Sequence, residues 1–208
     1  MDGFLAGIVD RYRAASAGFA RELRAVRPEQ WTWRTPCTEW NVHDLTNHMT
    51  RGNLNYVRLL RGGTAEDFVR LRDADALGSD PVAAFVRSVR ECAAAFDEPG
   101  ALETVLDYPL GRAAAGQLLA VRTTDTVVHT WDLARATGGD EVLDAALVSW
   151  VDGNLAAIYA GLVETPTAAQ TTHRFFGPPP DSGSPPGELS TQDRLLYRMG
   201  RDPYAPGW

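Results

Sequence analysis

Residues 122–139 read RTTDTVVHTWDLARATGG. The segment is typical of a helix, and it places Asp125 and His129 four residues apart. Residues at positions i and i+4 lie on the same face of a helix. A carboxylate and an imidazole held in this way can bind one divalent cation, so the pair is a candidate for two ligands of a metal site.

A third ligand is predicted in the stretch NVHDLTNHMTRGNLNYVRLL, residues 41–60, which contains His48 at another helical position. If the two helices pack together, His48 can reach the same cation as Asp125 and His129. Three such ligands leave coordination positions open for water or substrate, which is the pattern of catalytic zinc and related divalent sites. Asp125 lies between Val121 and Val128, where an unpaired charge is costly unless it meets a cation or hydrogen-bond donors.

The spacing of Asp125 and His129 alone has a simpler explanation, because surface pairing and capping produce the same pattern in ordinary helices. Asp44 repeats this spacing with His48 and is a candidate fourth ligand, although capping of the helix or support of a ligand is the favoured role. Asp132 is interpreted as a ligand-supporting or helix-surface group. The other two histidines, His43 and His173, are interpreted as surface residues.

Two arginines are candidates for binding an anionic substrate beside the metal. Arg51 follows His48 by three residues and Arg122 precedes Asp125 by three, although exposed helix-surface arginines would give the same pattern. Gly52 follows His48 by four residues, which predicts space beside the imidazole.

Cys37 lies in the stretch TPCTEW, near the start of a predicted helix whose dipole would favour a thiolate. No histidine stands beside it in the sequence to act as a base, so a buried structural cysteine is favoured over a catalytic one. For the tryptophans, core and loop packing is favoured over a place in a pocket wall; these are Trp31, Trp33, Trp40 and Trp131.

Apolar periodicity and helix-stop residues predict an all-α bundle in one domain that spans residues 1–208. The expected helices cover residues 3–26, 42–61, 81–97, 114–136 and 143–162, the last stopping at Thr165 and Pro166, with a short helical piece at 190–200. Residues 64–79 are a polar connection, and residues 99–113 are a loop with a brief strand. The Pro-rich tail, residues 166–208, is expected to dock on the bundle through Phe175, Phe176, Leu195, Leu196 and Trp208.

The composition excludes several classes of protein. A net charge of −7 argues against binding of nucleic acid, and all 20 basic residues are arginine, which removes lysine-based chemistry. Cys37 and Cys92 are far apart and in no metal-binding or redox spacing, which favours a reduced protein. With no signal peptide and no apolar run long enough to span a membrane, we expect a cytoplasmic protein without membrane partners. A homodimer is left open.

Three stretches resemble the mycothiol-dependent maleylpyruvate isomerase N-terminal-domain family, within the DinB-like metalloprotein superfamily. They are TPCTEWNVHDLTNHM (35–49), DTVVHTWDLARATGGD (125–140) and DRLLYRMGRDP (193–203). The resemblance implies an up-down-down-up four-helix bundle with a divalent metal, usually zinc or nickel, at one end. By motif, the metal ligands fall on His48, Asp125 and His129.

The resemblance also implies an enzyme in which the metal activates the sulfur of a low-molecular-weight thiol. The well-understood isomerase carries Glu at the position of Asp125, and it has a C-terminal α/β domain where this chain has its short Pro-rich tail. We therefore expect a metal-dependent enzyme that uses mycothiol for S-transfer to a small electrophile or for cis-trans isomerisation. A non-catalytic protein that binds a metal or small ligand and a metal-water hydrolase are the alternatives.

Overall fold

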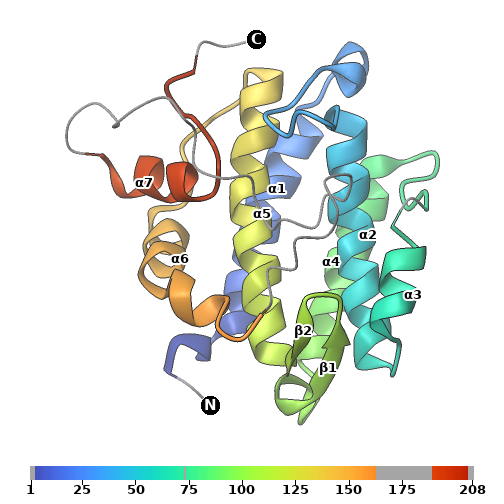
Figure 1. The fold of residues 1–208 in the computed structure, drawn as a ribbon. Helices are drawn as coiled ribbons and strands as arrows, with labels where there is room; N and C mark the ends of the chain where they lie inside the picture. The colour runs from blue at the N-terminus through green and yellow to red at the C-terminus, as the bar shows by residue number, and fades with distance from the viewer. Residues whose placement is uncertain (1–2, 73, 163–188, 206–208) are drawn as a thin grey trace.

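Four long helices pack side by side around a shared apolar core (Figure 1). They are α1 (Ile8–Arg24), α2 (Val42–Leu60), α4 (Pro81–Phe96) and α5 (Ala115–Thr137). The structure is a computed structural model, and it describes residues 3–72, 74–162 and 189–205. Within these residues the strands form one short hairpin, and the prediction of an all-α bundle is confirmed.

The directions of the four helices follow from which of their ends meet. Phe19 near the end of α1 packs on Phe85 near the start of α4, with ring centroids 4.8 Å apart, so these helices are antiparallel. Tyr56 and Phe96 lie near the ends of α2 and α4, and their rings are 6.4 Å apart, so these helices are parallel. Helices α1 and α5 run in the same direction, as the colours of Figure 1 show. The order is therefore up-down-down-up.

The start of α2 is fixed by a capping box formed by Asn41 and Asp44. The Asn41 side chain accepts a hydrogen bond from the Asp44 amide at 2.9 Å, and the Asp44 carboxylate accepts one from the Asn41 amide at 3.2 Å. Both bonds satisfy amides that have no partner inside the helix. Asp44 thus has the capping role favoured from the sequence, and α2 has a defined first turn, after which His48 projects from the second turn.

Replacing Asn41 with alanine is expected to lower the free energy of unfolding by about 1 kcal/mol, because the first turn of α2 loses its side-chain acceptor. Urea denaturation followed by circular dichroism measures the change. An unfolding curve identical to that of the wild type would contradict the capping role of this residue.

The remaining elements of the described residues are short. They are η1 (Gly3–Leu5), η2 (Pro28–Thr32), α3 (Ala65–Arg70), η3 (Ala101–Glu103), β1 (Val105–Tyr108), β2 (Gly111–Ala114), α6 (Ala145–Ile158) and α7 (Thr191–Arg198). Strands β1 and β2 pair antiparallel, with Val105 opposite Ala114. The segment predicted as a loop with a brief strand is thus a hairpin, and the predicted polar connection contains α3.

Two predicted helix limits were wrong. The first helix does not run unbroken from residue 3, because Gly7 has a φ of 69°, outside the right-handed helical region, and separates η1 from α1. Helix α6 ends at Ile158, short of the predicted residue 162. The predicted stop at Thr165 and Pro166 lies outside the described residues.

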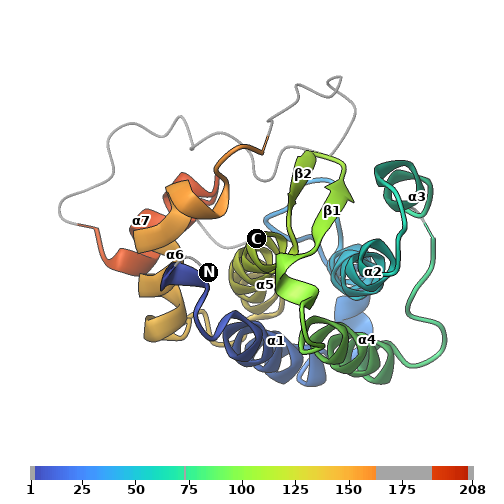
Figure 2. The ribbon, with the colours of Figure 1, turned by 90° about the horizontal axis from the view of Figure 1, so that it is seen from below.

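Helices α6 and α7 lie together on one side of the bundle, and α3 lies on the opposite side (Figure 2). Leu195 and Leu196 of α7 are fully buried in a cluster with side chains of α5 and α6. Asp152 of α6 pairs with Arg194 at 2.6 Å and with Arg198 at 3.0 Å. The short helix near the C-terminus is thus held against the bundle by both apolar and charged contacts. Phe175, Phe176 and Trp208 lie outside the described residues.

None of the helices in the described part of the chain combines the length and the apolar character that a membrane span requires.

Candidate metal centre

Helices α2 and α5 bring together the three predicted metal ligands. His48 projects from the second turn of α2, and Asp125 and His129 project from one face of α5. Asp125 Oδ2 is 3.3 Å from His48 Nε2, and Asp125 Oδ1 is 3.1 Å from His129 Nε2. One ligand atom from each residue lies within 4.8 Å of the others, so the three donors face a common point. This is the set that the sequence predicted.

The exposure of the three side chains is graded across the site. His129 is 4% exposed, Asp125 18% and His48 28%. The indole of Trp40 lies 4.5 Å from the His48 ring and 5.9 Å from the His129 ring, measured between centroids. Trp40 therefore forms a wall of the site, the less favoured of the two roles that its sequence context predicts. Access from solvent is on the side of His48 and Asp125.

Arg122 supports the carboxylate of Asp125 from inside the bundle. Its guanidinium pairs with Asp125, donates from Nε to Asn53 Oδ1 at 2.9 Å, and donates to the carbonyl oxygen of Met49. Only 2% of the Arg122 side chain is exposed. Of the two arginines predicted to contact substrate, Arg122 is thus engaged by protein groups, whereas Arg51 lies half-buried on α2.

Gly52 makes room for the guanidinium of Arg122. A Cβ atom at this position would lie 2.7 Å from both Cζ and Nη1 of Arg122. The sequence predicts space at Gly52 beside the imidazole of His48, and the structure shows that the guanidinium of Arg122 fills it. This difference could not be found from sequence spacing, because it depends on how α5 packs against α2.

Gly52→Ala is therefore expected to lower the free energy of unfolding by about 1–2 kcal/mol, because the displaced guanidinium loses buried hydrogen bonds worth more than the gain in helix propensity. Gly153→Ala is the matched control. Gly153 also lies inside a helix, α6, but has open space where its Cβ would be, so this change should stabilise the protein by up to about 1 kcal/mol. The melting temperature should fall for Gly52→Ala and rise for Gly153→Ala. A shift in the same direction for both variants would contradict the close contact at Gly52.

The charges of the site are strongly coupled. Burial opposes ionisation of Asp125, but the neighbouring His129 and His48 hold the pKa of its carboxyl well below the usual range. Burial also opposes protonation of His129, but Asp125 and Asp132 hold its pKa well above the usual range. Partial burial lowers the pKa of His48 to about 4 despite the nearby carboxylate. Without a metal, His129 thus carries the positive charge that balances Asp125, and a divalent cation would take over this role.

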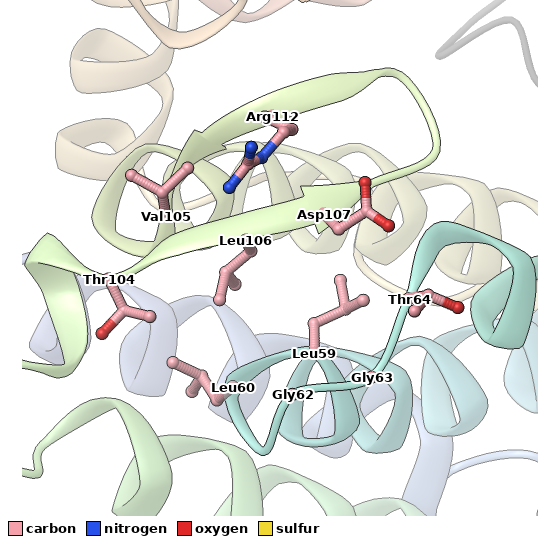
Figure 3. A pocket seen from close by; sticks show the side chains of 10 residues that line it. All are labelled: Leu59, Leu60, Gly62, Gly63, Thr64, Thr104, Val105, Leu106, Asp107 and Arg112. Atoms are coloured by element: carbon pink, nitrogen blue, oxygen red, sulfur yellow. The ribbon is translucent and has the colours of Figure 1, made fainter.

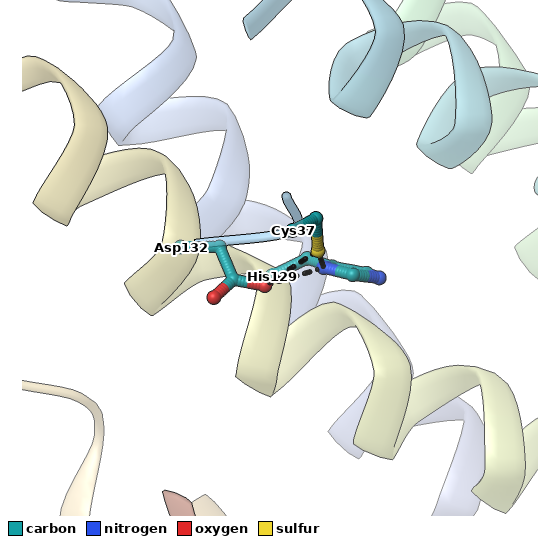
Figure 4. Close-up of side chains that lie close together, drawn as sticks. All are labelled: Cys37, His129 and Asp132. Atoms are coloured by element: carbon teal, nitrogen blue, oxygen red, sulfur yellow. Dashed lines mark hydrogen bonds and ion pairs between the residues drawn. The ribbon is translucent and has the colours of Figure 1, made fainter. Parts of the chain in front are cut away.

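A second cluster lies on the other side of the His129 ring (Figure 4). Asp132 Oδ2 is 2.8 Å from His129 Nδ1, and Cys37 Sγ is 3.8 Å from the same nitrogen. Arg201 donates to both oxygens of Asp132 at 2.7 Å and from Nη2 to Cys37 Sγ at 2.9 Å. Cys37, His129 and Asp132 form a second group with metal-ligand spacing, but the guanidinium of Arg201 already neutralises it. Burial raises the pKa of the Cys37 thiol, which agrees with the structural role favoured from the sequence.

Sequence patterns do not reveal Arg201 or the contact between Cys37 and His129. Cys37 and His129 are 92 positions apart, and Arg201 and Asp132 are 69 positions apart, so no local spacing connects them. The one signal is the stretch DRLLYRMGRDP, which contains Arg201 and carries part of the resemblance to the family.

A hollow of about 510 Å³ lies at the far end of α2, between this helix and the β hairpin (Figure 3). Leu59, Leu60 and Leu106 line it together with the oppositely charged Asp107 and Arg112. It contains none of the candidate metal ligands, because His48 projects from the other end of α2. The site and this hollow are therefore separate features of the fold.

Comparisons with known proteins agree with this architecture. The family model of the mycothiol maleylpyruvate isomerase N-terminal domain matches residues 12–134, which include His48, Asp125 and His129. Two uncharacterized proteins from strains of Mycobacterium tuberculosis, MT0763 and Rv0738, are each 33% identical over 136 residues, which is 65% of this chain and 70% of each relative.

The crystal structure of the mycothiol-dependent maleylpyruvate isomerase is similar with a TM-score of 0.58 and 14% identity, over 75% of this chain and 72% of that chain. A structure of a histidine-to-alanine mutant of that enzyme gives a TM-score of 0.56 and 13% identity over the same shares. These two structures have the same fold as this chain. The family match over most of the bundle, together with the shared fold, shows that the chain belongs to the mycothiol maleylpyruvate isomerase N-terminal domain family.

Proposed function

We propose that this protein is a divalent-metal-dependent enzyme that uses a low-molecular-weight thiol, mycothiol, to transfer sulfur to a small electrophile or to isomerise one from cis to trans. The observation that carries the proposal is the convergence of His48, Asp125 and His129 within 4.8 Å of one another, beside a solvent-accessible face. The family membership supports the choice of thiol. A cytoplasmic location and small-molecule partners belong to the same proposal.

The residues present fit a divalent cation. Two imidazole nitrogens and one carboxylate oxygen are donors that zinc accepts, with nickel as the second choice. His129 is held rigidly by burial, and Asp125 is oriented by Arg122, so two of the three donors are fixed before an ion arrives. A bound divalent cation lowers the pKa of a coordinated thiol and so supplies a thiolate near neutral pH.

The surrounding residues would shape access to this centre. The indole of Trp40 covers one side of His48 and limits water there, and the exposed edges of His48 and Asp125 leave the other side open. Arg51 follows His48 on α2, and we retain it as a contact for an anionic electrophile. Arg122 would act on substrate through Asp125, because its guanidinium is buried and bonded to protein groups.

The test is turnover by the metal-loaded protein with mycothiol and a panel of electrophiles that includes maleylpyruvate, each with and without the thiol. Product formation that requires both the thiol and the protein, and that is lost in the His129→Ala variant, is the expected result. His43→Ala is the matched control, since this histidine lies in the first turn of α2 and half of its side chain is exposed.

The other outcomes assign the alternatives. Hydrolysis of an electrophile without thiol would contradict the proposal and identify a metal-water hydrolase. Metal or thiol binding with no turnover of any electrophile would also contradict it and would indicate a non-catalytic binding protein.

A further inference from the structure

We propose that Arg201, in the segment after α7, is a positioning residue that completes the metal centre by fixing His129 through Asp132. The proposal rests on the proposed function in one respect, namely that Nε2 of His129 binds the metal. Arg201 lies outside residues 12–134, which the family model matches. The role proposed for Arg201 would extend the site from the helical bundle to the C-terminal segment.

The contacts form a continuous chain from the C-terminal segment to the metal centre. Arg201 donates from Nε to Asp132 Oδ1 and from Nη2 to Asp132 Oδ2, both at 2.7 Å. Such a two-point contact fixes a carboxylate in both position and orientation. Asp132 is fully buried and Arg201 is 7% exposed, so the pair is shielded from water and ions. The carboxylate then bonds His129 Nδ1 at 2.8 Å.

This chain of bonds determines where His129 carries its proton. Both oxygens of Asp132 accept hydrogen bonds from Arg201, so Asp132 faces His129 as a carboxylate, which can only accept hydrogen bonds. Nδ1 of His129 must therefore carry a hydrogen. Nε2 of the same ring faces Asp125, 3.1 Å away, and the point shared with His48, so it is the ring nitrogen left to bind a cation. A carboxylate behind a metal-binding histidine orients the ring and raises its basicity in the same way.

Arg201 also makes a second metal site at Cys37, His129 and Asp132 unnecessary, because its own positive charge lies between these groups. Its Nη2 atom is 2.7 Å from Asp132 and 2.9 Å from Cys37 Sγ, so the guanidinium occupies the place where a cation would balance these groups. The group of Cys37, Asp132 and Arg201 thus forms the rear support of the His129 ring.

The anchoring of α7 keeps Arg201 in place. Leu195 and Leu196 are fully buried against the bundle, and the backbone amide of Arg201 donates to the carbonyl oxygen of Leu196 at 2.9 Å. Arg194 and Arg198 lie on the exposed side of α7 and pair with Asp152. Neither is hydrogen-bonded to His129 within the part of the chain that the structure describes. Arg194 therefore offers a matched control, since its removal weakens the anchoring of α7 and leaves the chain from Arg201 to His129 intact.

The experiment compares wild type with Arg201→Met, Asp132→Asn and the control Arg194→Met. The first readout is the Nδ1–H proton of His129 in metal-free protein, which NMR should detect as a slowly exchanging signal. The second is the affinity for Zn²⁺ by competition titration. We expect Arg201→Met and Asp132→Asn to lose the protected signal and to bind Zn²⁺ about 10–100-fold more weakly, while Arg194→Met behaves as wild type.

If Arg201→Met does not fold, Arg201→Lys tests the same point, because it keeps the charge but loses the two-point contact. Its affinity for Zn²⁺ should fall between that of the wild type and that of Asp132→Asn. Retention of both the protected signal and wild-type affinity in Arg201→Lys and Asp132→Asn would overturn the proposal. If the wild type binds no Zn²⁺, the proposed function fails. The NMR signal of the metal-free proteins then still decides whether Arg201 and Asp132 hold the ring.

Discussion

Replacing His129 with alanine is expected to weaken binding of Zn²⁺ at least about 100-fold, because it removes one of three protein ligands from a site whose whole binding energy comes from a few such bonds. His129 is the most buried of the three, so water replaces its imidazole poorly. Isothermal titration with a competing chelator measures the affinity.

The matched control for this prediction is His43→Ala. His43 lies on α2, five positions before His48, and is 51% exposed. It should leave the affinity unchanged. Equal weakening in both variants, or wild-type affinity in His129→Ala, would show that the cation binds elsewhere.

Replacing Arg122 with methionine is expected to lower the free energy of unfolding of the metal-free protein by about 3 kcal/mol. The change removes one partner of a buried ion pair and leaves the Asp125 carboxylate without its guanidinium. It also removes the donors to Asn53 and to the Met49 carbonyl oxygen. Chemical denaturation in the presence of a chelator measures the loss.

Two comparisons sharpen this prediction. Arg13→Met removes an exposed ion pair with Asp97 and should change stability by less than about 1 kcal/mol. Saturating Zn²⁺ should raise the free energy of unfolding of Arg122→Met by more than it raises that of the wild type, because the cation supplies the missing positive charge beside Asp125. The same loss from Arg13→Met, or equal stabilisation of Arg122→Met and of the wild type by Zn²⁺, would contradict the role given to Arg122.

Local sequence signals predicted the main helices well because each of these signals acts on the backbone near it. The Asn41 cap and Pro81 at the first position of a helix set the starts of α2 and α4, and Gly138 ends α5 with a φ of 70°. Helix α3 and the β hairpin were not predicted as such. Their segments are only four to six residues long, too short to show a periodicity, and they are formed through contacts with the end of α2 that the sequence does not show.

The residues of the candidate site likewise fall into those that local sequence patterns predict and those that they do not. His48, Asp125 and His129 could be named from sequence because the spacing on α5 and the helical setting of His48 required only that the two helices pack together. Arg201 could not be named, because its contact with Asp132 depends on how the chain returns to the bundle after α6. The neighbours of Gly52 were likewise set by the packing of two helices and not by the spacing along either one.

The central claim is that one divalent cation binds between α2 and α5, and titration of chelator-stripped wild-type protein with Zn²⁺ tests it most directly. We predict that one equivalent binds per chain, and that a His48→Ala, His129→Ala double variant binds none at the same concentrations. Absence of stoichiometric metal from the wild type, or full occupancy in the double variant, would contradict the claim.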